Sequence, residues 1–140
     1  MNYKRYNDRI IVRLDKGEEI IQSLKSICIE NHIKSGIITG IGATDKALIG
    51  LYDTSKKEYK TKEIKGDHEI TSLNGNISML DNDIILHLHI TLGDQDYNVI
   101  GGHLYSANVS VTFECIIEII NADIIRIHDS NTGLKLLSFK

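Results

Sequence analysis

The chain has 140 residues and a formal net charge of −3 at pH 7, with 16 lysines and arginines against 19 aspartates and glutamates. Hydrophobic residues make up 41% and charged residues 25%, an ordinary globular composition that excludes intrinsic disorder, collagen and coiled coil. No apolar run is long enough to span a membrane, and residues 1–10 lack the hydrophobic segment of a signal peptide. We therefore expect a cytoplasmic protein with no membrane partner.

The chain has no proline, no Gly/Ser-rich linker and no internal repeat, so we expect a single domain over residues 1–140. The acidic balance argues against a free-standing DNA-binding protein, because neutralising phosphates usually requires a basic surplus. Cys28 and Cys115 have apolar neighbours and no metal-finger spacing, which predicts two buried, reduced thiols.

The first predicted elements are a strand at residues 9–14 and a helix at about 17–32. Asp15 and Glu18 have the spacing of a capping box, with Asp15 as N-cap and Glu18 reaching back to it. An apolar stripe of helical period follows. Further on, Gly40 and Gly42 lack the third glycine of a dinucleotide fingerprint, so we interpret them as a turn or a close backbone approach.

The rest of the chain is rich in isoleucine, valine and threonine, which favour strands. The predicted strands are residues 36–41, 47–52, 58–64, 68–80, 84–92, 97–104 and 107–120. One helix among short-linked strands predicts an α+β (α/β sandwich-like) fold, in which a mainly antiparallel sheet packs with one principal helix.

Three of the six histidines fall in one predicted hairpin. His87 and His89 are two residues apart and therefore share a face of their strand. A turn centred on Gln95 would place His103 directly opposite His87. Neutral imidazole is a preferred zinc ligand, and three protein ligands with a free fourth position are typical of catalytic zinc. The alternative is three histidines on a polar sheet face, bonded to neighbours or water.

Other polar residues give weaker signals. Glu114 could join the site or orient a ligand. The remaining histidines are not expected to be ligands: His32 lies near the helix C-terminus, His68 precedes Glu69 on a strand, and His128 is beside Asp129. The better candidates for a basic surface are three arginines near one edge: Arg5, Arg9 and Arg13.

Several segments, in order, match a known family. These are Gly17-Glu18 before the helix, Ile41-Gly42-Ala43, Gly50-Leu51-Tyr52-Asp53, the segment from Gly66 to Gly75, His87-Leu88-His89 and Gly101-Gly102-His103-Leu104. In this combination the sequence resembles the PPC domain (plants and prokaryotes conserved). The resemblance implies a homotrimer with a divalent transition metal, zinc first, on His87, His89 and His103.

The resemblance also implies a DNA-related role, although the chain lacks the AT-hook of the plant members and has Asp67-His68 where they have Arg-Phe. Two functions follow. The first is a stand-alone, homotrimeric binding module with a structural metal, docking DNA or a DNA-bound regulator. Its contact segment would include Gly66, Glu69, Ser72 and Gly75. The alternative is a small metal-dependent enzyme of hydrolase type that uses a metal-bound water, with Glu69 or Glu114 as proton shuttle.

Overall fold

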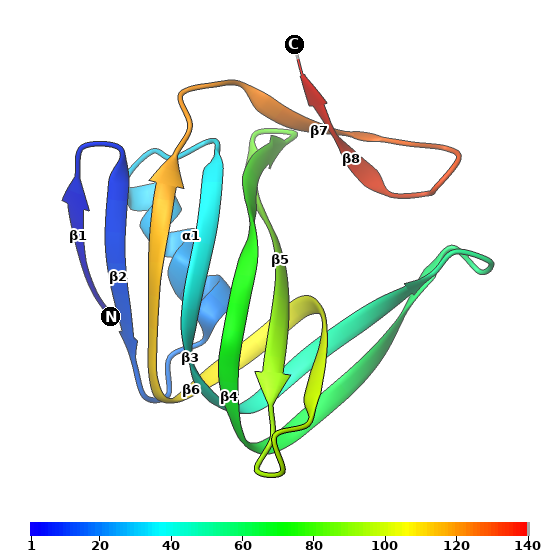
Figure 1. Ribbon diagram of the computed structural model, residues 1–140. Helices are drawn as coiled ribbons and strands as arrows, with labels where there is room; N and C mark the ends of the chain where they lie inside the picture. The colour runs from blue at the N-terminus through cyan, green and yellow to red at the C-terminus, as the bar shows by residue number, and fades with distance from the viewer. Residues whose placement is uncertain (140) are drawn as a thin grey trace.

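The computed structural model describes residues 1–139, in which a curved sheet carries a helix on one face (Figure 1). The helix is α1 (Ile20–Glu30). The strands are β1 (Asn2–Tyr6), β2 (Arg9–Asp15), β3 (Gly36–Asp53), β4 (Glu58–Leu80), β5 (Asp83–Gly93), β6 (Val99–Ile119), β7 (Ile124–His128) and β8 (Lys135–Phe139). The prediction of a sheet-rich fold with one principal helix is confirmed.

Neighbouring strands follow the order β1-β2-β6-β3-β4-β7-β8, and β5 pairs with both β4 and β6. All of these pairs are antiparallel except β4 with β7, so the sheet is mixed but mainly antiparallel, as predicted. Strands β3, β4, β5 and β6 each pair with two others of the same group, so their pairings close into a ring. This ring carries the candidate site.

Three of the strands are longer than predicted, because β3, β4 and β6 each run through a region where the sequence indicated a break. The β3–β4 register shifts between Gly40 and Gly42 and again between Thr44 and Lys46. A Cβ on Gly42 would collide with the carbonyl oxygen of Thr112. The glycines therefore allow a close backbone approach, as predicted, and the bulges bend the strand without ending it.

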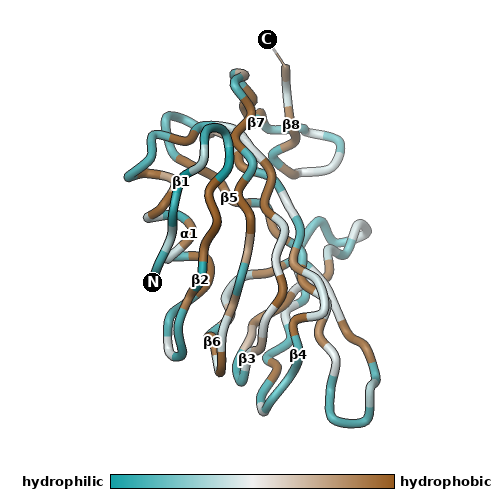
Figure 2. The backbone as a smooth tube through the Cα atoms, turned by 60° about the vertical axis from the view of Figure 1, so that its left-hand side comes forward, coloured by the Kyte–Doolittle hydropathy of each residue, from teal (hydrophilic) through white to brown (hydrophobic). Residues whose placement is uncertain are grey.

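The core lies between α1 and the inner face of the sheet. Alternation in β2 is regular, with Ile10, Val12 and Leu14 buried and the intervening residues exposed. Figure 2 shows apolar stretches along the strands and more polar ones at several turns. Cys28 and Cys115 lie in this core as free thiols, and burial raises the pKa of each to about 12. The prediction of buried thiols is confirmed.

The helix begins later than predicted. Glu18 does accept a hydrogen bond from the Asp15 backbone N–H, at 2.7 Å, but Gly17 has a φ of +90° and stops the helix from starting there. The true N-cap is Glu19, whose side chain accepts from Gln22 N. Half of the predicted capping pair therefore forms: the Glu18 side chain accepts from Asp15 N–H, but this hydrogen bond lies in a turn before the helix.

Three strands were not predicted at all. Every residue of β1 is exposed, so it carries no alternation of apolar and polar residues. Strands β7 and β8 form a hairpin that reaches back to the sheet through the pairing of Met79 with Ile125. Within residues 1–139, no helix is both long and apolar enough to cross a membrane.

Candidate metal centre

The three histidines of the predicted site lie together on β5 and β6. His89 is the direct partner of His103, and His87 lies two residues earlier on the same face of β5. The prediction had placed His87 opposite His103, so the register differs from it by two residues. An even shift keeps every side chain on its face, whereas a shift of one residue would have dispersed the cluster.

The three rings converge. Ring centroids are 5.2 Å apart for His87 and His89, 5.2 Å for His87 and His103, and 5.5 Å for His89 and His103. One nitrogen from each ring lies within 4.8 Å of the other two. Nitrogens bound to one zinc lie about 2 Å from the ion, so modest side-chain rotations would bring all three into coordination.

The electrostatics of the cluster favour neutral imidazoles. Burial lowers the pKa of His87 to about 4, and the nearby Arg126 and the other two histidines act in the same direction. Burial also lowers the pKa of His103, with His89 and Arg126 contributing. A neutral ring has a free lone pair, which is the form that binds a metal.

One ring nitrogen lacks a partner. His103 Nδ1 is buried and makes no hydrogen bond to any part of the chain that the structure describes. Buried polar atoms are nearly always hydrogen-bonded. An unpaired ring nitrogen within a histidine cluster is therefore consistent with a bound metal ion as its missing partner. The donor set and this atom together fit a transition metal.

The surrounding residues fix the positions of the rings. On β4, Asn76 lies opposite His87 and Asn74 opposite His89. A Cβ on Gly75 would collide with the carbonyl oxygen of His87, so only glycine fits at position 75 of β4. Paired strands on both sides thus hold β5 in place.

Aromatic rings and a pocket lie beside the cluster. The rings of Tyr59 and Tyr105 lie 5.1 Å and 4.9 Å from that of His103. A pocket of about 590 Å³ opens here, lined by His87, His103, both tyrosines and Arg126 and closed on one side by the β7–β8 hairpin. This pocket could not be predicted from the sequence, because Arg126 and the hairpin are remote from the histidines along the chain.

The amino-acid sequence matches a known protein family. The sequence model of the Plants and Prokaryotes Conserved (PCC) domain matches residues 1–121. The chain belongs to this family, which is also written PPC. The resemblance seen in the sequence is therefore confirmed. No curated protein matches the chain.

Solved structures agree with this assignment. The PPC domain described here is similar to a "putative DNA binding protein" from Bacteroides thetaiotaomicron, with a TM-score of 0.95 and 35% identity over 99% of this chain and 96% of that one. It is also similar to a metal-containing protein from Archaeoglobus fulgidus, with a TM-score of 0.87 and 34% identity over 99% of both chains. A PPC protein from Pyrococcus horikoshii gives a TM-score of 0.85 and 32% identity, over 99% and 95%.

Two acidic residues proposed as proton shuttles lie outside the histidine cluster of this PPC domain. Glu69 lines a separate hollow with Asp67 and Asp94, near the end of β5. Glu114 lies on β6, paired with Arg13 on β2, and lines a groove on another part of the sheet. Among the described residues, the cluster within ligand distance contains only histidines.

The predicted contact segment runs along β4. Gly66 is exposed with a φ of +86°, and Glu69 is exposed. Ser72 is half-buried and accepts a hydrogen bond from Asn74 Nδ2, while Gly75 packs against His87. Only the second half of the segment therefore adjoins the histidines.

The three arginines expected to form a basic surface are largely engaged. Arg9 Nε lies 3.1 Å from a carboxylate oxygen of Glu118, and Arg13 Nε lies 3.2 Å from one of Asp15. Arg5 donates to two backbone carbonyls. Acidic neighbours thus offset much of the positive charge at this edge of the sheet.

Proposed function

We propose that this PPC domain is a metal-binding module that holds one divalent transition metal through His87, His89 and His103. Zinc is the first candidate for this metal. The observation that carries the proposal is the convergence of three imidazole nitrogens to within 4.8 Å of one another. The lowered pKa values of His87 and His103 and the orphaned His103 Nδ1 support it. The similar metal-containing protein from Archaeoglobus fulgidus supports it independently.

Cobalt(II) substitution tests the geometry of this site. Cobalt replaces zinc in imidazole sites, and its visible absorption reports the coordination number. We expect the metal-free protein to bind one cobalt per chain with the intense bands of a four-coordinate site. We expect His89→Ala to lose these bands and the control His128→Ala to keep them, because His128 is exposed on β7. Weak octahedral bands in the wild type would contradict the proposal.

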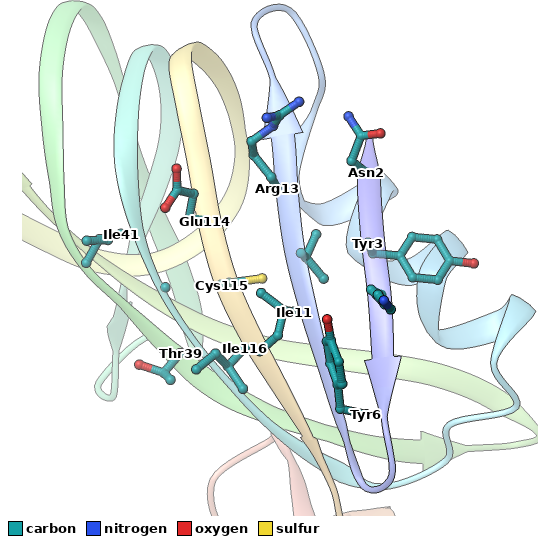
Figure 3. Close-up of a pocket in the computed structure, with 13 residues that line it drawn as sticks. Asn2, Tyr3, Tyr6, Ile11, Arg13, Thr39, Ile41, Glu114, Cys115 and Ile116 are labelled. Atoms are coloured by element: carbon teal, nitrogen blue, oxygen red, sulfur yellow. The ribbon is translucent and has the colours of Figure 1, made fainter.

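We also propose that the module is a homotrimer. Support comes from the face of the sheet opposite α1, where Ile11, Ile37, Ile41 and Ile116 are 40–60% exposed. We call these four residues the outer apolar face. Ile11 pairs with Ile116 across β2 and β6. Figure 3 shows both residues, with Ile41, around a groove of about 730 Å³. An apolar surface of this kind is typical of a protein interface.

As a binding module, the trimer would dock DNA or a DNA-bound regulator. This part of the proposal draws on the similar protein from Bacteroides thetaiotaomicron, which is described as a "putative DNA binding protein". The net charge of −3 and the paired arginines favour the regulator, because direct binding to duplex needs unpaired cations. The segment with Gly66, Glu69, Ser72 and Gly75 is the proposed contact surface.

A metal-dependent enzyme of hydrolase type is the second candidate. One observation favours it: the pocket of about 590 Å³ opens directly beside His87 and His103. Three protein ligands leave a zinc position open, and a metal there supplies a bound water of lowered pKa. The chain's own residues at that pocket are Arg126, Tyr59 and Tyr105, which would orient a substrate.

A further inference from the structure

The pocket beside the histidines has the size of a small-molecule site. Its volume is about 590 Å³, within the range of roughly 300–1,000 Å³ that ligand pockets occupy. The ring strands form one wall and the β7–β8 hairpin forms the other. We call it the hairpin pocket, defined by His87, His103, Tyr59, Tyr105, Arg126 and the apolar side chains described below.

The charge of the hairpin pocket is positive and uncompensated. Arg126 donates from Nε to Ser78 Oγ at 2.8 Å, from Nη2 to Asn76 Oδ1 at 2.8 Å and from Nη1 to the Lys135 carbonyl at 2.7 Å. All three acceptors are neutral. Within residues 1–139, no carboxylate pairs with Arg126, and no acidic side chain lines the pocket.

The hydrogen bonds of Arg126 leave part of its guanidinium free. A guanidinium has five N–H donors, and the three bonds leave one on each terminal nitrogen. Two N–H donors on the terminal nitrogens of one guanidinium can bind the two oxygens of a carboxylate. Asn76 and Ser78 on β4 hold the arginine in this orientation, and Asn76 is also the strand partner of His87.

Apart from Gly133 and Lys135, the rest of the lining is apolar, which selects among anions. Leucine and isoleucine side chains from β4, β5 and the β7–β8 hairpin surround the charged end, namely Leu80, Ile85, Leu86, Leu134 and Leu136. A small inorganic anion would lose its hydration against this wall without an apolar contact in return. A monoanion with an apolar body can contact Arg126 with its charged group and the leucine and isoleucine side chains with its body.

We propose that the hairpin pocket binds a small organic carboxylate, with its charged group at Arg126 beside the three histidines and its apolar body against the leucines. This inference rests on the proposed metal site and names the class of ligand that the site would take. The metal and Arg126 would together provide the positive charge that the carboxylate neutralises.

Isothermal titration of the zinc-loaded protein with hexanoate tests the proposal, with hexan-1-ol as the neutral probe of the same length. We expect saturable binding of one hexanoate per chain and no binding of the alcohol. Arg126→Gln is expected to weaken hexanoate binding at least tenfold. Arg9→Gln, which removes an arginine paired with Glu118 at the other edge, should bind as the wild type does.

A second variant guards against misfolding of Arg126→Gln. Leu136 is 39% exposed on β8, so Leu136→Asp should fold, and its carboxylate would occupy Arg126 and exclude hexanoate. If the zinc-loaded wild type binds no hexanoate, or if Arg126→Gln and Leu136→Asp bind it as tightly as the wild type, the inference is overturned while the metal site stands. If protein that retains no zinc binds hexanoate, the carboxylate pocket is supported and the metal is not needed for this binding.

Discussion

His89 and His103 are direct partners across β5 and β6, with their ring centroids 5.5 Å apart. His87 lies beside them, two residues before His89 on the same face of β5. All three histidines therefore come from paired strands of the ring and from no loop. A site built on paired strands is held more precisely than one built on loops, so changes to strand packing should alter it.

Gly75→Ala should destabilise the protein and weaken metal binding. The added Cβ would meet the carbonyl oxygen of His87, so β4 and β5 must move apart. We expect a loss of about 2–3 kcal/mol in the free energy of unfolding, as for overpacking in a core. Urea denaturation of the metal-free protein measures it. The control is Gly93→Ala, whose Cβ would only contact Thr71 at 3.5 Å. Equal stability of the two variants would contradict the close approach at Gly75.

Acid should destabilise the metal-free protein. The pKa of His87 falls from its ordinary 6.5 to about 4 on folding, so the unfolded chain binds more protons between these values. The stability from His87 is complete above about pH 6.5 and is lost as the pH falls towards 4. We expect a loss of about 1–2 kcal/mol, since water screens a half-buried ring.

Urea denaturation over this pH range measures the loss. His87→Gln should flatten the dependence, because glutamine does not titrate. Exposed His128→Gln should leave it unchanged. A pH dependence that is the same in His87→Gln and the wild type would show that another group is responsible.

Ile116→Lys should dissociate the proposed trimer. This residue lies at the middle of the outer apolar face, and a buried lysine without a partner is costly. Sedimentation velocity should give three times the 15.7 kDa chain mass for the wild type and a monomer for the variant. Ile29→Lys is the control, because Ile29 is also exposed (55% against 40% for Ile116) but lies on α1, across the core. A monomeric wild type would rule out the trimer.

Binding to DNA can be tested directly by electrophoretic retardation of a duplex. If the trimer contacts DNA, retardation should occur at low salt and disappear as salt rises, because phosphate contacts release counterions. The acidic balance and the paired arginines predict weak retardation at best. Tight binding that persists at high salt would contradict this, and no retardation at low salt would leave a DNA-bound regulator as the partner.

The sequence could predict which residues share a face but not which residues are opposite each other. The period of two placed His87 and His89 together, and this depends on the strand alone. The pairing with His103 depends on the turn at Asp94 to Asn98, where Asp94 Oδ1 accepts from two backbone N–H groups. The alternation along β5 therefore placed both histidines on the correct face, although the predicted register was wrong by two residues.

Local signals also failed where tertiary contacts decide. Only half of the capping pair of Asp15 and Glu18 formed. The helix starts at Ile20, because Gly17 has a φ of +90° and its N–H donates to the Val109 carbonyl on β6. The hairpin pocket depends on Arg126, which reaches β4 through hydrogen bonds to Asn76 and Ser78. Neither contact leaves a mark in the nearby sequence, so neither could be predicted.

The most direct test of the central claim is the metal content per chain, by plasma mass spectrometry of untagged protein. We predict about one zinc or other transition metal per chain in the wild type and in His128→Ala, and none in His103→Ala. Wild-type protein that holds no metal after exposure to zinc and desalting would contradict it, as would a His103→Ala variant that keeps its metal.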